Sequence, residues 1–270
     1  MKLKTPLIDL TQEQDSLETD YYSIKSKLSN SSFKRFMECS ARAYAEHSGE
    51  IVRASSDALI IGSYIDSMLF NEEVTVDTSS LYKKDGMLKK TNAYLTTIID
   101  DIQEDKEFWK YLEGDYQKQK FFDFEGIPWK AKLDVDPTHF PDAIVDFKTA
   151  AKIEDWIYSK RFGHRVPFWY GRGYDIQGAT YCEAWDRKRF ILAIATKQEP
   201  SGRHIIEIPE AMLIQAREYI VSNQETVFAQ MHGEKIEYCN DPECKYCRKN
   251  RKTILTVADV ISTDKEERPF

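Results

Sequence analysis

The spacing of apolar residues predicts mainly helices over the first 112 residues of the chain. A capping cluster at residues 29–32 precedes FKRFMECSARAYAEH, whose apolar residues recur every three or four positions, as on one helix face. Similar spacing predicts a second helix over about residues 56–70, and another helix or a pair over residues 88–112. Residues 1–28 are polar and show little periodicity, so we expect an N-terminal arm there.

Between about residues 118 and 148 the period becomes that of strands. The runs FFDF, EGIPWKAKLDV and AIVDFK are separated by turn residues, which predicts three strands of an antiparallel sheet. After the link FGHRVPFWYGRGYD, residues 175–186 return to helical spacing, and FILAIATK and HIIEIP are predicted as further strands. A long helix is then predicted over about residues 209–231.

This order of elements predicts one α+β domain with a helical N-terminal part. We expect the domain to span residues 29–252 and to include a Cys-rich segment over residues 239–247, followed by a tail over residues 253–270. A hydrophobic content of 41% and an aromatic content of 13% are typical of a globular protein. No apolar run approaches the roughly 18 residues that span a bilayer, so we expect no membrane partner.

The charge and the N-terminus narrow the function classes. A net charge of −7 argues against a protein coated in basic surface, but a cleft with local Lys and Arg side chains can still bind DNA. The N-terminus lacks the apolar core of a signal peptide, which predicts a cytoplasmic location. Five cysteines in a cytoplasmic chain are not expected to form disulfides, so their spacing is more informative about metal binding.

Asp134 and the run Asp146-Phe147-Lys148 form the candidate catalytic centre. Strand residues two apart share a face, which places Asp146 and Lys148 together. A hairpin centred on Phe140 would set Asp134 opposite Asp146. Mg²⁺ prefers oxygen ligands, and two carboxylates with the backbone carbonyl of Phe147 suit it, while Lys148 can stabilise charge on a phosphate. The alternative is a polar strand face whose charges pair across the hairpin.

Two pairs of residues at helical spacing add to this candidate centre. Gln177 and Tyr181 are four residues apart and share a helix face, where they can contact phosphate or water; an ordinary polar and aromatic pair is the alternative. Gly62 and Asp66 are also four apart, and Asp66 lies among apolar residues, where a metal, a lysine or a helix terminus must compensate its charge. Cys182, beside Tyr181, is expected to be a packed thiol.

Together these residues resemble the PD-(D/E)XK nucleases, and among them the RecB-like and RecE-like exonucleases of phages and prophages of Gram-positive bacteria. The resemblance covers about residues 20–250. It implies a mixed central sheet flanked by helices. The family pattern is matched in order by Gly62-x₃-Asp66, Asp134, Asp146-Phe147-Lys148 and Gln177-x₃-Tyr181.

The resemblance also implies the roles of these residues. Asp134, Asp146 and the Phe147 carbonyl would bind Mg²⁺ or Mn²⁺, and Lys148 would be the catalytic lysine. Asp66 stands where many relatives have His and would be a further oxygen ligand. The catalytic set implied in this way consists of Lys148, Asp134, Asp146, Gln177 and Tyr181, the last two helping to place the DNA strand.

The implied activity is that of a metal-dependent exodeoxyribonuclease in the cytoplasm of a bacterial host cell. Such an enzyme digests one strand of linear double-stranded DNA and passes the other to a single-strand annealing protein in phage-type recombination. Relatives commonly form rings, so a homo-oligomer is implied. Two alternatives stay open: a non-catalytic DNA-binding or recombination scaffold with this fold, and an endonuclease of the same superfamily.

Cys239, Cys244 and Cys247 form a C-x₄-C-x₂-C run, and C-x₂-C is a spacing used by zinc and iron–sulfur sites. Cys39 is the candidate fourth ligand. Some RecB-like nucleases join an N-terminal cysteine to three C-terminal ones through a 4Fe–4S cluster, and the resemblance implies the same here. Zn²⁺, with Cys39 or His232 as fourth ligand, and free thiols are the alternatives.

Basic residues beside aromatic ones suggest where a DNA strand would lie. Arg161, Arg165 and Arg172 flank the aromatic residues 168–170, and aromatic faces can stack bases while Arg neutralises phosphate. Lys132, on the charged strand face, is a further candidate for DNA contact. The alternative is a loop that packs its aromatic side chains inward.

Overall fold

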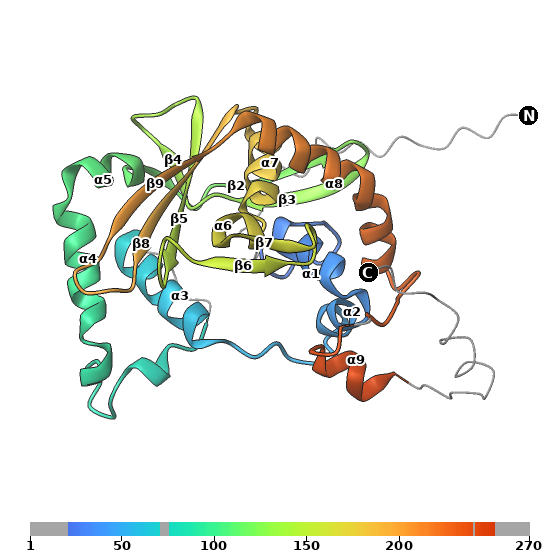
Figure 1. Ribbon diagram of the computed structural model, residues 1–270, viewed down its shortest axis with the longest axis horizontal. Coiled ribbons are helices and arrows are strands. Elements are labelled where there is room, and N and C mark those ends of the chain that lie inside the picture. Colours follow the sequence, from blue (N-terminus) through green and yellow to red (C-terminus); the bar gives the residue numbers. More distant parts are fainter. Residues whose placement is uncertain (1–20, 71–75, 240, 252–270) are drawn as a thin grey trace, which may run out of the picture.

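The computed structural model describes residues 21–70, 76–239 and 241–251 (Figure 1). The tail predicted over residues 253–270 lies outside the described residues, as does most of the arm predicted over residues 1–28. Within the described part of the chain, no helix is long and apolar enough to cross a membrane.

A mixed five-stranded sheet flanked by helices forms the centre of the molecule, and the resemblance to PD-(D/E)XK nucleases implies such a mixed sheet (Figure 1). In the order β1-β4-β5-β8-β9, β5 and β8 run parallel and the other neighbours antiparallel. Strand β8 is buried on both faces, which explains its nearly unbroken apolar run, and β5 is buried along most of its length, including at Asp146. The strands are β1 (Gly114–Tyr116), β4 (Val135–Pro137), β5 (Ala143–Ala150), β8 (Arg189–Thr196) and β9 (Arg203–Ile208).

Strand alternation determines which side chains meet the helices on each face. Val145 and Phe147 of β5 point into a core formed with α3, α4 and α5. Ile144 points into the opposite core, which includes residues of α7 and α8. Asp146 and Lys148 follow Ile144 by two and four residues. Their side chains therefore share its face of the sheet and lie on the α7 side. The helices are α3 (Asp57–Phe70), α4 (Tyr94–Glu104), α5 (Lys106–Leu112), α7 (Tyr174–Trp185) and α8 (Glu210–Met231).

Helix α7 packs closely against β8 and α8 because Gly178 has no side chain. A Cβ atom at Gly178 would lie 2.5 Å from the Phe190 ring and 2.8 Å from Leu213 Cδ2. Both contacts are too short for any larger residue without rearrangement. The glycine therefore lets the helix with Gln177 and Tyr181 lie directly on the strand beside β5.

Strands β2 (Gln119–Phe124) and β3 (Ile127–Lys132) form a separate two-stranded sheet. The prediction of one three-stranded antiparallel sheet over residues 118–148 is therefore wrong, since the third run is β5 of the central sheet. The chain leaves β3 after Lys132 and starts β4 at Val135, and Trp129 of β3 bridges instead to Leu28.

The predicted first helix is two helices, α1 (Asn30–Glu38) and α2 (Ser40–Ser48), separated by Cys39. Ser29 forms the expected cap of α1, with the hydroxyl of Ser32 completing a capping box. The backbone of Cys39 is extended (φ −164°, ψ 103°), and its sulfur accepts a hydrogen bond from the Arg42 amide at the start of α2. Because the helix is interrupted at Cys39, its thiol points in a direction that a continuous helix would not allow.

The Gly- and aromatic-rich link contains a hairpin and a short helix that the sequence pattern did not indicate. Strands β6 (Trp156–Ser159) and β7 (His164–Pro167) pair antiparallel, and α6 (Phe168–Gly171) follows directly. Gly171 lies against Ile157, since a Cβ atom there would be 2.6 Å from Ile157 Cγ1. The remaining short elements are η1 (Ser79–Leu81), η2 (Lys90–Asn92) and α9 (Lys245–Asn250).

Candidate active site

Strands β4 and β5 bring the three predicted charged residues together. Val135 pairs with Val145, so Asp134 and Asp146 occupy the next position in the same register. The Nζ atom of Lys148 lies 2.6 Å from Asp146 Oδ2 and 3.3 Å from Asp134 Oδ2. It also donates a hydrogen bond to the Phe147 carbonyl at 3.0 Å. The ammonium therefore occupies the point on which all three predicted metal-binding oxygens converge.

Helix α7 fixes the orientation of the Asp146 carboxylate. Gln177 Nε2 donates to Asp146 Oδ1 at 2.8 Å and to Tyr181 Oη at 3.1 Å, as expected for residues one helical turn apart. The side chain of Asp146 is fully buried. Its Oδ2 atom has the Lys148 ion pair but no hydrogen-bond partner within the described residues. One carboxylate oxygen is thus held by Gln177, and the other is left to a cation.

Burial dominates the electrostatics of the site. Burial raises the pKa of the Asp146 carboxyl, although the nearby Lys148 ammonium acts to lower it. The negative charge of Asp134 adds to the increase. Burial alone would lower the pKa of Lys148, but the carboxylates of Asp134 and Asp146 outweigh it and raise that pKa well above its usual value. Burial also raises the pKa of the Tyr181 phenol well above its usual value, so Tyr181 stays neutral.

Lys34 of α1 is a site residue that the sequence analysis missed. Its Nζ donates to the Arg172 carbonyl at 3.1 Å and lies 5.7 Å from the centre of the Tyr174 ring, as does Lys148 Nζ. Burial and the Lys148 charge lower the pKa of Lys34 to about 8. No local pattern could reveal this residue, because only tertiary packing places α1 beside α7.

Helix α3 approaches the same end of β5 through Gly62. A Cβ atom at Gly62 would lie 3.7 Å from Thr149 Oγ1, next to Lys148. One turn further, Asp66 is half-buried and its negative charge acts on Lys197, opposing the burial that lowers the pKa of that lysine. Among the described residues, the carboxylate oxygens of Asp66, Asp134 and Asp146 do not gather within 4.8 Å of one another.

The basic residues predicted for DNA contact differ in their surroundings. Arg161 Nη1 lies 2.6 Å from Oδ2 of the fully buried Asp175, so its charge is already compensated inside the protein. Arg165 is exposed and donates to the Trp156 carbonyl. Arg172 is exposed at the start of α7, beside Lys34.

Lys132 and the aromatic residues of the link lie at different places. Lys132 Nζ donates to Tyr22 Oη at 3.3 Å and lies over its ring, so it contacts the segment that precedes α1. Phe168 is buried, whereas Trp169 and Tyr170 are half-buried. The most exposed aromatic residues described in this region are instead Trp156 and Tyr158 of β6, with 54% and 63% of their surface exposed.

A second group of predicted residues gathers elsewhere in the fold. The sulfur atoms of Cys39, Cys239, Cys244 and Cys247 all lie within 4.8 Å of one another. His232 is not in this group, and its Nδ1 contacts the Phe228 carbonyl at 2.8 Å. Cys182 lies apart on α7, where burial raises its pKa to about 12, as expected for a packed thiol.

A mixed sheet flanked by helices, with paired carboxylates and a lysine on adjacent strands, defines the PD-(D/E)XK nuclease fold. Residues 29–250 match the model of the family described as "PDDEXK-like domain of unknown function (DUF3799)", and the chain belongs to this family. The match confirms the resemblance to PD-(D/E)XK proteins. None of the curated proteins matches the sequence significantly.

Among solved structures, one is clearly similar to this chain and another is only weakly similar. A crystal structure of a candidate exonuclease from Eubacterium rectale is 29% identical, with a TM-score of 0.77 over 91% of this chain and 98% of that one. A phage-related exonuclease from Haemophilus somnus 129PT is 15% identical over 63% of this chain and 94% of that one. Its TM-score of 0.30 supports no further argument.

Proposed function

We propose that this protein is a divalent-metal-dependent exodeoxyribonuclease that digests one strand of linear double-stranded DNA. The observation that supports it best is the convergence of Asp134 Oδ2, Asp146 Oδ2 and the Phe147 carbonyl on one cation position, within 3.3 Å of Lys148 Nζ. The Eubacterium rectale protein, which spans almost the same fold, supports an exonuclease over other nucleases.

The oxygen atoms at this position fit Mg²⁺ or Mn²⁺. Hard divalent cations take carboxylate and carbonyl oxygens, and Mg²⁺ keeps several waters in addition. Asp146 Oδ2 is buried and has the Lys148 ammonium, at 2.6 Å, as its cationic partner, whereas the Asp134 side chain is 29% exposed, which leaves the site open to solvent on one side. A divalent ion held here supplies charge that stabilises phosphate oxygens and lowers the pKa of water.

The side chains of the site have separate roles in this proposal. Gln177 holds Asp146 in a single orientation through its bond to Oδ1. Lys148, which lies beside these oxygens, would stabilise negative charge that develops on the scissile phosphate. Tyr181 remains a neutral hydrogen-bonding group because burial raises its pKa.

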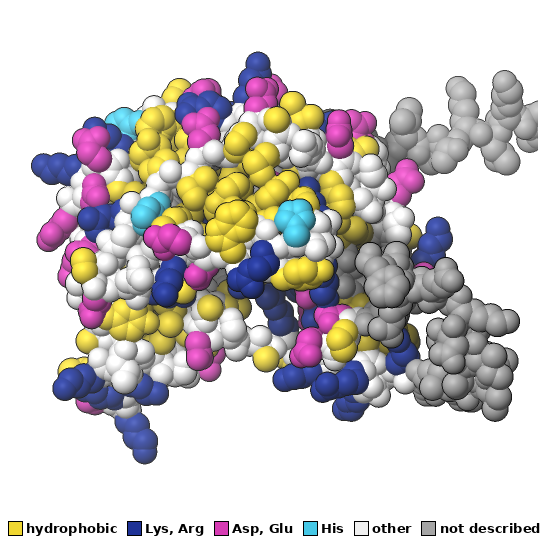
Figure 2. Space-filling view, in the orientation of Figure 1, with side chains coloured by type: hydrophobic (Ala, Val, Ile, Leu, Met, Phe, Trp, Pro, Cys, Tyr) yellow, Lys and Arg dark blue, Asp and Glu magenta, His cyan; other side chains and the backbone are white. Residues whose placement is uncertain are grey.

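The surface beside the site offers contacts for a DNA strand. Figure 2 shows hydrophobic side chains over the β6–β7 hairpin, with Lys and Arg side chains below it, where the surface is hollowed. Ile157 of the hairpin faces Gly171, so the alternate residues Trp156 and Tyr158 face outward. We propose that these two rings stack on bases while Arg172 contacts the backbone.

The deciding experiment is digestion of linear duplex DNA with each end blocked in turn, with closed circular DNA and EDTA as controls. We expect Mg²⁺-dependent release of nucleotides from linear DNA only, and loss of activity by about 10²–10³-fold in Asp146→Asn and Lys148→Ala. Cleavage of circular DNA would indicate an endonuclease. Binding without any cleavage would indicate a non-catalytic scaffold.

Assembly and partnership belong to the same proposal. The resemblance to RecE-like enzymes supports a homo-oligomeric ring that passes the remaining strand to a single-strand annealing protein in phage-type recombination. Light scattering coupled to size exclusion would give the mass of the assembly, and a mass equal to one chain would contradict the ring.

A further inference from the structure

The segment that follows α8 is attached through a small core made mainly of cysteine. The buried members of this core are Cys39, Ala41, Cys244 and Cys247, with Ile236, Cys239 and Tyr246 packed against them. Hydrophobic burial stabilises by about 25 cal/mol per Å² of apolar surface, and thiols and one alanine offer little such surface. Hydrogen bonds also attach this segment to α2, since Ser40 Oγ donates to the Glu237 carbonyl at 3.0 Å and accepts from the Glu237 amide at 2.9 Å. Neither these bonds nor apolar burial explains why four thiols gather at one point.

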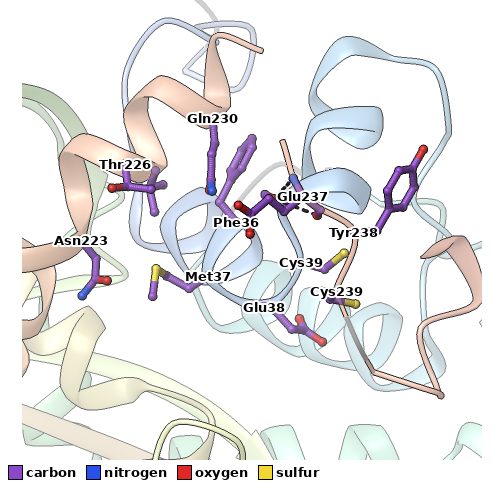
Figure 3. Close-up of a pocket in the computed structure, with 12 residues that line it drawn as sticks. Phe36, Met37, Glu38, Cys39, Asn223, Thr226, Gln230, Glu237, Tyr238 and Cys239 are labelled. Atoms are coloured by element: carbon purple, nitrogen blue, oxygen red, sulfur yellow. Dashed lines mark hydrogen bonds between the residues drawn. The ribbon is translucent and has the colours of Figure 1, made fainter. Parts of the chain in front are cut away.

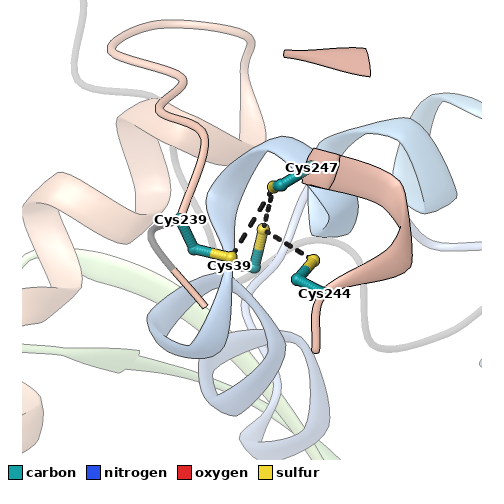
Figure 4. Close-up of side chains that lie close together, drawn as sticks. All are labelled: Cys39, Cys239, Cys244 and Cys247. Atoms are coloured by element: carbon teal, nitrogen blue, oxygen red, sulfur yellow. Dashed lines mark hydrogen bonds between the residues drawn. The ribbon is translucent and has the colours of Figure 1, made fainter. Parts of the chain in front are cut away.

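The thiols point toward a common centre from two distant parts of the chain (Figure 4). Cys39 Sγ lies 3.2 Å from Cys247 Sγ and 3.9 Å from Cys244 Sγ, and the sulfurs of Cys239 and Cys247 are 3.6 Å apart. A disulfide needs about 2.05 Å, so none of these pairs is bonded. Four sulfurs bonded tetrahedrally to one ion at about 2.3 Å lie about 3.8 Å apart, which agrees with the observed spacing.

A 4Fe–4S cluster does not fit this arrangement. Each cysteine of such a cluster binds a different iron of a cube that also contains four sulfides, so the thiolates stand outside its corners. The cube must then fit between sulfur atoms that all lie within 4.8 Å of one another, where the space suffices for one ion only. The cluster that the resemblance to RecB-like nucleases implied is therefore at odds with the thiol geometry.

We infer that Cys39, Cys239, Cys244 and Cys247 bind a single Zn²⁺ ion in a closed structural site. Four thiolates in a tetrahedron are the donor set of structural zinc, and with all four positions filled by protein the ion has none left for a substrate. Cys39, Cys244 and Cys247 are buried, and Cys239 is half-buried.

The surroundings of the thiols meet the other requirements of a metal site. The Arg42 amide donates to Cys39 Sγ at 3.5 Å, and Arg251 Nη2 donates to the Cys239 carbonyl at 2.6 Å, which orient these two ligands. A pocket of about 340 Å³ between α1, α8 and residues 237–239 has Cys39 and Cys239 in its wall (Figure 3). It gives the ion a path from solvent.

The site joins parts of the chain that are far apart in sequence. Cys39 and Cys247 are separated by 208 positions, and the ligand pair thus ties the α1–α2 junction to the segment after α8. Bringing the ends of so long a loop together costs conformational entropy, which metal binding would offset. Since α1 also supplies Lys34 to the acidic site, the zinc site supports the position of that helix.

The test is the metal content of the full chain, purified under reducing conditions without added metal. We expect about one zinc per chain by mass spectrometry of the metal and a colourless protein. A mercurial reagent that modifies the thiols should release this zinc to a chromogenic chelator, which requires no variant to fold. Iron with inorganic sulfide and broad visible absorption, or no bound metal, would overturn the inference.

Variants locate the zinc. Cys244→Ser with Cys247→Ser should reduce bound zinc at least tenfold and make residues 241–251 sensitive to protease. Cys182→Ser, which changes the cysteine outside the group, should keep the zinc. Asp146→Asn should keep it as well, which separates this site from the acidic one. Zinc retained by the double variant would contradict the assignment, whatever the nuclease assay shows.

Discussion

Lys148 is the residue on which the acidic site depends in the absence of a metal. Its ammonium lies between two carboxylates, one of them fully buried, and a carbonyl oxygen. Removing the cationic partner of a buried pair leaves uncompensated charge, which is more costly than the pair itself is stabilising. The lysine therefore has a structural effect that a bound divalent ion should replace.

Replacing Lys148 tests this exchange. We expect Lys148→Met to lose on the order of 3 kcal/mol of unfolding free energy without metal. Mg²⁺ should then raise the melting temperature of the variant more than that of the wild type, because the ion compensates Asp134 and Asp146. The exposed Lys110→Met, paired only with Glu107 in the described structure, is the control and should change stability by about 0.5 kcal/mol or less. Equal responses to Mg²⁺ would contradict the shared position.

Lys34 predicts a pH dependence of stability. Its pKa of about 8 in the folded protein lies below the usual value of 10.5. Between these two pH values the unfolded chain binds more protons at this position, so the folded state gains stability as pH rises. In chemical denaturation, we expect the unfolding free energy of the wild type to rise relative to that of Lys34→Met between pH 8 and pH 10. A difference in unfolding free energy that stays constant with pH would contradict a lowered pKa of Lys34.

At the scale of elements, two glycines in the middle of helices have opposite roles. Gly178 is required because its Cβ position lies against Phe190, whereas at Gly62 the nearest atom, Thr149 Oγ1, is at an ordinary contact distance. We expect Gly178→Ala to destabilise by about 1–3 kcal/mol through overpacking. Gly62→Ala should instead stabilise by about 0.5–1 kcal/mol through helix propensity. Thermal unfolding of the two variants measures whether stability falls in Gly178→Ala and rises in Gly62→Ala.

The β6–β7 hairpin leads to a prediction about strand binding. If Trp156 and Tyr158 stack on bases, each alanine substitution should weaken single-strand binding by about 1–3 kcal/mol, with little dependence on sequence. Met87→Ala removes an equally exposed apolar side chain from another part of the surface and is the matched control. Fluorescence anisotropy with a labelled oligonucleotide, in EDTA to prevent cleavage, measures the difference. Unchanged affinity would assign the rings another role.

At the scale of the whole molecule, a net charge of −7 means that DNA is attracted only locally. Each phosphate contact to duplex DNA adds about 0.9 to the slope of log affinity against log salt. We expect Arg172→Ala to reduce this slope by about one, and Lys110→Ala, on a helix of the opposite face, to leave it unchanged. An unchanged slope in Arg172→Ala would place the strand elsewhere.

The packing of distant segments explains where sequence-based expectations were incomplete. The run after Pro128 was expected to pair with β5, but β3 pairs with β2 and bridges to Leu28 instead. The helix before Ser48 was expected to be continuous, but Cys39 interrupts it where its thiol meets Cys247. Both differences follow from contacts with residues about 100 or more positions away, and local periodicity contains no information on these.

The sequence by itself determined the main helices, strands β5, β8 and β9 of the central sheet, and the position of Asp134 opposite Asp146. These follow from local rules, since alternation sets the face of each strand residue and a symmetric hairpin sets the partner. Only the tertiary structure decided that Lys34 lies beside the acidic site, that Arg161 is compensated by Asp175, and how closely the four thiols approach. These depend on how whole elements pack, which no spacing within one element specifies.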